Sequence, residues 1–129
     1  MEKHIKQFIL TADSKALGTI SSEGIINVVP VSSIKVINEK IVLVNYFMDK
    51  TLENIKSNNQ VSLVVWSKMI GYQIKGTVEY LTNGSVFDEI VLWIRETIPS
   101  RTVKGVILIT PNEIYDIAPS KNTDETLQT

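Results

Sequence analysis

Leu43-Val-Asn-Tyr-Phe-Met-Asp-Lys-Thr-Leu-Glu-Asn-Ile55 runs from an apolar, strand-like segment directly into an expected helix with Lys50 and Thr51 in its first turn. The first backbone N–H groups of a helix have no partner within the helix, and the helix dipole makes this end positive. A lysine ammonium and a threonine hydroxyl at the same place favour an anion, so the stretch predicts a phosphate site. A plainer interpretation stays open, in which Asp49 is an N-cap and Lys50 is a solvated residue of the first turn.

Strand-like segments lie on both sides of this stretch. Upstream, residues 16–37 are typical of a hairpin that turns at Ser22-Glu23-Gly24, and a second turn is expected at Asn38-Glu39-Lys40. Downstream, residues 60–66 and 71–80 are expected to form two more strands. Residues 104–110 are predicted to form a strand that turns at Pro111-Asn112 into a further strand, residues 114–117.

Two further helices are expected to flank the strands. Residues 2–11 have apolar side chains at helical spacing, and a second helix begins near Gly84-Ser85 with one wide apolar face. These apolar residues are Ile5, Phe8, Ile9 and Ala12 in the first helix, and Val86, Phe87, Ile90, Val91 and Ile94 in the second. Residues 120–129 are too polar to bury much surface and are predicted to be disordered. We therefore expect a single domain over residues 1–119.

The order of these segments resembles the FMN-binding split-barrel family of pyridoxamine-phosphate-oxidase-like proteins, and especially small members such as the FMN-binding proteins of sulfate-reducing bacteria. The resemblance covers residues 16–117 and depends on the order and spacing of several short matches. These are Gly24, Asn27-Val-Val-Pro-Val31, Met48-Asp-Lys-Thr51, Asn54, Val61-Ser-Leu63 and Ile74-Lys-Gly-Thr77. It implies a mainly β fold, an antiparallel split β-barrel with flanking helices.

The resemblance also implies an FMN cofactor and the residues that hold it. In this family the strand that matches residues 29–32 lies along the isoalloxazine ring, and the positions of Lys50 and Thr51 hold the phosphate. The implied cofactor-binding residues are Val29, Pro30, Val31, Ser32, Asn45, Tyr46, Met48, Lys50 and Thr51. The residue types suit these roles, because residues 29–31 offer an apolar surface and Pro30 has no backbone N–H. Ser32 and Ser33 can donate to the polar edge of the ring. If this strand is only central sheet, Pro30 must lie at an edge or a bulge.

The implied function is that of an FMN-dependent flavoprotein, either a small oxidoreductase or an electron-transfer protein. Two alternatives stay open: a non-enzymatic flavin carrier, and a barrel module that binds oligonucleotides without flavin. Vitamin B6 oxidase activity is not expected. The true oxidases have a basic segment near the C-terminus, whereas Tyr115-Asp-Ile-Ala-Pro-Ser120 contains neither arginine nor histidine. Lys50 stands where oxidases of the family place an arginine, so the charge is kept and the bidentate fork is lost.

Composition narrows the function classes. A chain of 129 residues with a net charge of -1 has no basic footprint for nucleic acid. The absence of cysteine excludes disulfides, thiolate metal sites and a cysteine nucleophile. His4 is the only histidine, so a histidine metal cluster or a serine–histidine triad cannot be assembled. Neither a signal peptide nor a transmembrane run is expected, which predicts a cytoplasmic protein. The 43% hydrophobic content in so short a chain, together with the family resemblance, predicts a homodimer.

Several other residues have structural explanations. His4 is expected on the surface and Trp93 in the core, and Trp66 is more typical of a core or interface position than of a ligand site. Asp88 and Glu89 are adjacent on a helix, so they point in different directions and do not suit a two-carboxylate mechanism. Gly71 and Gly76 bracket a strand, where a bulge or a close backbone approach accounts for them. The sequence therefore predicts no catalytic side chain and no metal site.

Overall fold

The computed structural model describes residues 1–119 and 126–128. In these residues one antiparallel sheet has the strand order β2-β1-β5-β6-β7-β4-β3, and β8 pairs with β7 beside this path. The strands are β1 (Ser14–Ile20), β2 (Ile26–Pro30), β3 (Ile34–Ile37), β4 (Lys40–Asn45), β5 (Gln60–Ser67), β6 (Ile70–Leu81), β7 (Gly105–Asp116) and β8 (Thr126–Gln128). The helices are α1 (Lys3–Thr11), α2 (Asp49–Ser57) and α3 (Ser85–Thr97).

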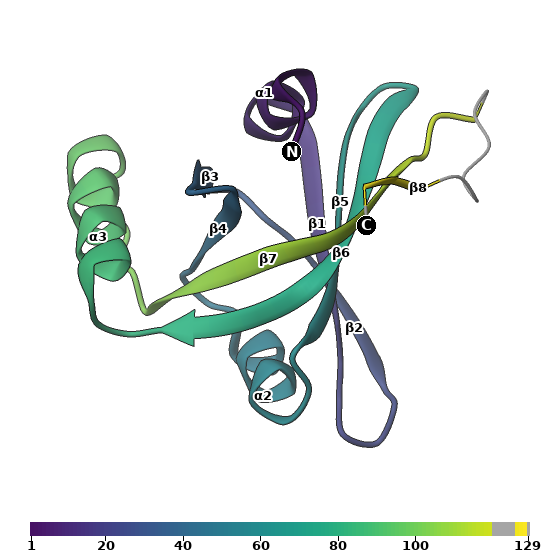
Figure 1. Cartoon of the computed structure of the whole chain (residues 1–129). Coiled ribbons are helices and arrows are strands. Elements are labelled where there is room, and N and C mark those ends of the chain that lie inside the picture. Colours follow the sequence, from purple (N-terminus) through teal and green to yellow (C-terminus); the bar gives the residue numbers. More distant parts are fainter. Residues whose placement is uncertain (120–125, 129) are drawn as a thin grey trace.

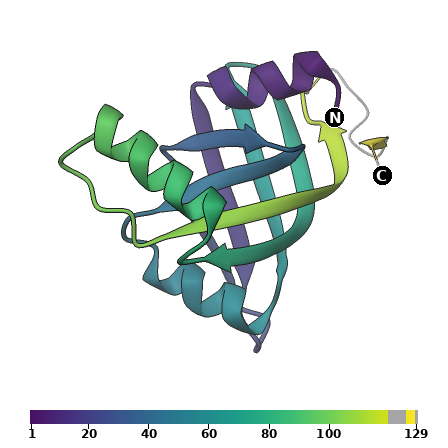
Figure 2. The same cartoon turned by 60° about the vertical axis from the view of Figure 1, so that its left-hand side comes forward.

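The sheet curls into a barrel with helices around it (Figure 1). In both views α1 and α2 lie at opposite ends of the barrel, and α3 lies against the outer side of β4 and β7 (Figure 2). The expected mainly β fold with flanking helices is confirmed.

The two hairpins predicted upstream of α2 are present. Gly24 has a φ of 85° in the turn between β1 and β2, a conformation that glycine adopts without steric cost. Asn38 and Glu39 have φ values of 50° and 65° between β3 and β4, as in a two-residue turn that matches the twist of its strands. The Glu39 carboxylate accepts a hydrogen bond from Lys6 of α1 at 2.8 Å, which lowers the pKa of this carboxyl and ties α1 to the hairpin.

The predicted turn at Pro111-Asn112 is wrong, because β7 continues through both residues. Lys75 pairs with Glu113 and Gly76 with Pro111, so Asn112 is an extra residue opposite β6 and forms a β-bulge. A bulge accommodates proline, which cannot donate to the ladder. The prediction that residues 120–129 are disordered is wrong for 126–128, which form β8 against Ile114 and Tyr115. Residues 120–125 and 129 lie outside the described part of the chain.

The core has two parts, separated by β4 and β7. Ile41 and Leu43 of β4 face the barrel interior, whereas Val42 and Val44 pack under α3. Strand β7 alternates in the same way, with Ile107 and Ile109 inside and Val106 and Leu108 under the helix. Because α3 covers the outer face, both faces of these strands are buried, which explains their continuous apolar runs.

The helices bury the faces that their sequences predict. Ile5, Ile9 and Ala12 close one end of the barrel, and Ile90 and Ile94 of α3 are fully buried. Trp93 packs against the α3 part of the core but remains half-buried, with Lys35 Nζ 4.5 Å from its ring centroid. Within the described residues, each helix is too short or too polar to span a membrane.

Gly76 is required by the packing of β6 on β7. A Cβ built at this position would overlap the carbonyl oxygen of Thr110. We expect Gly76→Ala to lower the free energy of unfolding by about 1–3 kcal/mol, because the backbone must shift to admit the methyl group. Gly18→Ala is the matched control, since its Cβ would meet Ser62 O at an ordinary 3.4 Å. Chemical denaturation measures both variants, and equal stability would show that the β6–β7 pairing tolerates a side chain here.

Candidate functional site

Two cavities open beside the end of β2. The first, which we call the Trp66 cavity, has a volume of ≈420 Å³. The second, the Tyr46 cavity, has a volume of ≈280 Å³. The Trp66 cavity is lined by Asp13, Ser14, Lys15, Ala16, Val28, Val29, Pro30, Val31 and Trp66, and the Tyr46 cavity by Val29, Pro30, Ser32, Tyr46, Phe47, Met48 and Arg101. Val29 and Pro30 belong to both linings, so the end of β2 forms a wall between the two cavities.

This wall is accessible because β2 is an edge strand. Strand β2 pairs with β1 at one end of the strand order, and Pro30 is its last residue. The edge position accounts for the proline, because an edge strand need not donate every backbone N–H. Pro30 and Ser32 are exposed, Val29 is half-buried, and Val31 turns into the barrel core.

The buried side chain of Asn45 shapes the junction between β4 and α2. Its Oδ1 accepts a hydrogen bond from the Met48 backbone N–H at 2.7 Å, and its Nδ2 donates to the Tyr80 hydroxyl at 2.8 Å. Asn45 is fully buried and does not line either cavity. It therefore holds the turn that carries Tyr46, Phe47 and Met48. The flavin contact that the family resemblance implies for Asn45 stays a prediction.

Tyr46 is contacted at its hydroxyl and over its ring. Its hydroxyl shares a 2.8 Å hydrogen bond with the buried Ser33 hydroxyl, and the Arg101 guanidinium carbon lies 4.7 Å from its ring centroid. The Ser33 hydroxyl is thus already engaged within the protein. Ser32 is exposed beside the cavity and is the serine of this pair that a ligand can reach.

The first turn of α2 has no side-chain cap among the described residues. Met48, and not Asp49, stands at the N-cap position, while Asp49 is the first helical residue and lies 3.5 Å from Lys104 Nζ. The Lys50 side chain is 65% exposed and makes a long contact of 3.5 Å with Glu53. An exposed pair of this kind contributes little to stability, so Lys50 remains available to a ligand.

Thr51 and Asn54 face the barrel and bind polar side chains of the first hairpin. Thr51 is fully buried, and its hydroxyl accepts a hydrogen bond from Asn27 Nδ2 at 3.3 Å. Asn54 Nδ2 donates to the Thr19 hydroxyl at 3.0 Å. Because Thr19 and Asn27 are paired across β1 and β2, this polar cluster fixes the start of α2 against the β1–β2 hairpin. The Thr51 hydroxyl is not open to solvent, so a phosphate could not reach it without moving Asn27.

The structure brings together five of the nine predicted cofactor-binding residues around the Tyr46 cavity: Val29, Pro30, Ser32, Tyr46 and Met48. Val31 lines the Trp66 cavity. Asn45, Lys50 and Thr51 do not line either cavity; they belong to the turn and helix that follow Tyr46. The sequence analysis missed Phe47 and Arg101. No sequence pattern pointed to Arg101, because it lies in the irregular segment between α3 and β7 and is distant from Tyr46 in the sequence.

Other candidate groups lie elsewhere. His4 is exposed on α1 with its Nδ1 3.2 Å from Glu2, as the sequence led us to expect. Asp88 and Glu89 are exposed on α3. Across residues 1–119 and 126–128, no three histidine, aspartate or glutamate side chains gather closely enough to hold a metal ion.

The curled antiparallel sheet with its three flanking helices places this chain in the split-barrel class of proteins. The family model described as pyridoxamine 5'-phosphate oxidase matches residues 1–118, and the chain belongs to this family. An uncharacterized protein of Methanocaldococcus jannaschii is 32% identical over 108 residues, covering 78% of this chain and 70% of that protein.

Solved structures share the fold at low sequence identity. HupZ of Group A Streptococcus has a TM-score of 0.83 and 19% identity, covering 95% of this chain and 98% of that one. An FMN-binding protein from Syntrophomonas wolfei subsp. wolfei has a TM-score of 0.78 and 18% identity, covering 91% and 86%. HutZ, the heme storage protein from Vibrio cholerae, has a TM-score of 0.69 and 15% identity, covering 88% and 92%. These neighbours establish the split barrel, and their names describe different ligands.

Asn45 should be essential to the junction between β4 and α2. We expect Asn45→Ala to lower the free energy of unfolding by about 1–3 kcal/mol, because it leaves the Met48 N–H and the Tyr80 hydroxyl without their partner. Lys50→Ala, on the exposed side of α2, should change it by no more than about 0.5 kcal/mol. Urea denaturation of both variants measures the difference. A loss for Asn45→Ala as small as that for Lys50→Ala would contradict the structural role of the amide.

Proposed function

We propose that this protein binds FMN along the end of β2 and acts as a small flavin-dependent oxidoreductase or electron-transfer protein. The observation that carries the proposal is the Tyr46 cavity, in which the end of β2 meets the turn before α2. Membership of the pyridoxamine 5'-phosphate oxidase family and the fold shared with an FMN-binding protein support the choice of cofactor. When bound, FMN supplies the redox chemistry, so the protein needs no acid–base constellation of its own.

The residues around the cavity fit a flavin ring. Val29, Pro30 and Met48 offer apolar surface, and Pro30 has no N–H that a ring would leave without an acceptor. Ser32 is exposed at the rim and can donate to the polar edge of the ring, where negative charge gathers on reduction. The chain thus orients the ring with one apolar strand end and one hydroxyl.

The start of α2 fits a phosphate group. Within the described residues no side chain caps this helix, so its first backbone N–H groups can donate to an anion, and the helix dipole favours negative charge there. Lys50 supplies an exposed ammonium group. The buried Thr51 hydroxyl and Asn27 hold the helix in position.

The first test compares FMN with riboflavin, which lacks the phosphate. Lys50→Ala should weaken FMN binding about tenfold and leave riboflavin binding unchanged, since a charge-assisted contact is worth about 1.5–3 kcal/mol. Lys56→Ala is the matched control, because it removes the same charge from the other end of α2. Fluorescence quenching of the flavin measures both affinities. Equal losses for FMN and riboflavin would remove Lys50 from the phosphate site, and no binding of either flavin by the unaltered protein would refute the proposal.

A non-enzymatic flavin carrier is the second candidate function, because it would use the same cavity and the same contacts to FMN. The two candidates differ in turnover. A carrier releases and rebinds FMN and is reoxidised by air without consuming an organic substrate, whereas an oxidoreductase accelerates the transfer of electrons to or from one.

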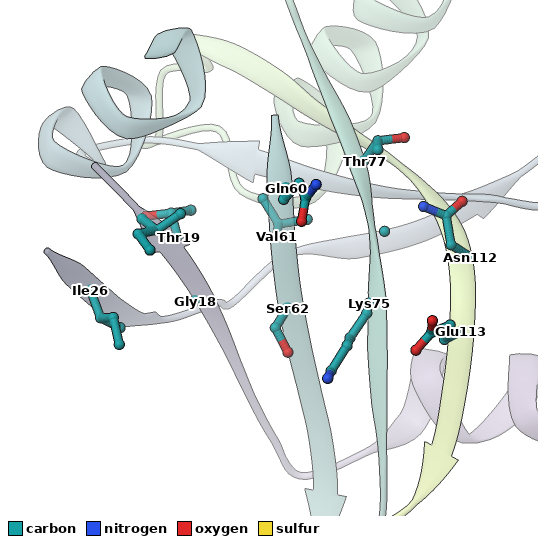
Figure 3. A pocket seen from close by; sticks show the side chains of 12 residues that line it. Gly18, Thr19, Ile26, Gln60, Val61, Ser62, Lys75, Thr77, Asn112 and Glu113 are labelled. Atoms are coloured by element: carbon teal, nitrogen blue, oxygen red, sulfur yellow. The ribbon is translucent and has the colours of Figure 1, made fainter. Parts of the chain in front are cut away.

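We also propose a homodimer, formed by the outer face of β2, β1, β5 and β6. Ile26 and Val28 of β2 are 74% and 64% exposed on this face. The register places Val28, Gly18, Ser62 and Lys75 in one row across the four strands. A hollow of ≈400 Å³ opens here, where Gly18 has no side chain and that of Ser62 is small. Figure 3 shows this hollow, with Lys75 between Ser62 and Glu113. The exposed apolar side chains of Ile26 and Val28 beside this hollow suit a self-complementary interface, in which each copy covers them on the other.

Val28→Glu should convert the dimer into a monomer at micromolar concentration, because a carboxylate would be buried without a partner in the interface. Leu92→Glu is the control, since Leu92 is 53% exposed on α3 and lies outside this face. Sedimentation velocity gives the oligomeric state of each variant. If the unaltered protein sediments as a stable monomer, the proposed interface does not form.

A further inference from the structure

The chain contains only two arginines. Arg95 lies in the last turn of α3, and Arg101 lies in the segment between α3 and β7. They line a cavity of ≈220 Å³ together with Val91, Ile94, Pro99, Thr102 and Val103, a lining without any carboxylate. Among the described residues neither arginine forms an ion pair. Arg101 differs from Arg95 because it also lines the Tyr46 cavity, on the other side of the same segment.

The Arg101 guanidinium lies on the ring of a buried tyrosine. The Tyr46 ring is buried and tied by its hydroxyl to Ser33, and the guanidinium lies over that ring at 4.7 Å. The Arg101 backbone N–H donates to the Ile98 carbonyl at 3.0 Å, which shapes the turn that presents the side chain. Stacking on an aromatic ring uses the flat face of a guanidinium and leaves the N–H donors at its edge free. These donors match the two oxygens of a phosphate or a carboxylate.

The neighbouring cations have other roles. Arg95 lies in the last turn of α3, where a positive charge offsets the helix dipole. Lys104 lies beside Phe47, and its Nζ is 3.5 Å from the Asp49 carboxylate, which offsets its charge. Within the described residues, Arg101 is thus the one charged side chain of the Tyr46 cavity lining, and its donors are not engaged by an acid.

We propose that Arg101 binds an oxyanion, a phosphate or carboxylate group, at the Tyr46 end of the cavity. This inference rests on the proposed flavin site and adds a residue that its sequence pattern does not contain. The oxyanion has two possible sources: the phosphate of FMN itself, or an acidic group on a second ligand that lies against the flavin. Both use the same fork of N–H donors, and binding measurements separate them.

The first arm of the test uses inorganic phosphate and the flavin-free full chain. Because the sequence has only two arginines, the Nε–Hε region of a ¹⁵N spectrum contains two arginine signals, which Arg95→Lys assigns. Phosphate should shift the Arg101 signal saturably, with a smaller change at Arg95. This arm does not depend on FMN binding, so a failure of the proposed flavin function leaves the Arg101 result readable.

The second arm measures FMN and riboflavin affinities in Arg101→Ala, Arg101→Lys and Arg95→Ala. If Arg101 holds the FMN phosphate, Arg101→Ala should lose about tenfold in FMN affinity and none in riboflavin affinity, as expected for a charge-assisted contact. Arg101→Lys should restore part of this loss, because it keeps the charge without the fork. If Arg101 serves a second ligand, FMN affinity stays constant, and phosphate still shifts the Arg101 signal in the FMN-loaded protein.

The proposal is overturned if phosphate leaves the Arg101 signal in place and Arg101→Ala leaves FMN affinity unchanged. It is also overturned if Arg95→Ala abolishes the phosphate shift of Arg101, since the anion would then lie in the cavity between the arginines and away from Tyr46.

Discussion

The pair of hydrogen bonds made by the buried Asn45 amide is the constraint on which the site depends. One bond ties the end of β4 to the Tyr80 hydroxyl on β6, and the other holds the Met48 N–H in the turn before α2. A fully buried amide without these partners would cost more free energy than the bonds contribute, so the turn has one favourable geometry. That geometry fixes the place of Tyr46 and Met48 in the cavity wall and the direction in which α2 begins.

A second set of buried polar contacts fixes the other side of the same junction. Thr51 and Asn54 of α2 bind Asn27 and Thr19, which face each other across the first hairpin. The edge strand β2, which has a ladder partner in β1, is thereby also held by the helix that follows β4. The two sides of the Tyr46 cavity come from the end of β2 and from the turn before α2, and this polar cluster ties the β1–β2 hairpin to the helix that follows that turn.

The sequence predicted the parts of the fold that depend on local patterns. Helical spacing found α1 and α3, and turn residues at Gly24 and at Asn38-Glu39 placed the first two hairpins. The bulge at Asn112 was missed because proline followed by asparagine has the same local signature as a turn, and only pairing with β6 shows that the strand continues.

The residues of the site were likewise predicted where they depend on local sequence. Residues next to one another in the chain, such as those of β2 and of the turn before α2, were predicted together. The burial of Asn45 at the end of β4 and of Thr51 in the first turn of α2 could not be read from their residue types, because asparagine and threonine are mostly exposed in folded proteins. Arg101 could not be found because its position over Tyr46 exists only after β7 has paired with β4 and brought the end of α3 beside the turn.

The differing ligands in the names of the structural neighbours indicate how this fold accommodates chemistry. The barrel and its buried polar contacts set where a cavity opens, whereas the side chains around that cavity decide what enters it. In this chain the wall is apolar along β2, and the charge in the Tyr46 cavity lining comes from Arg101 in the segment after α3. Lys50 lies outside this lining, in the first turn of α2. Since neither charge supports the core, either can change without loss of the fold. Changes at Lys50 and Arg101 can therefore alter the selectivity for a ligand while the Asn45 contacts at the junction keep the cavity in place.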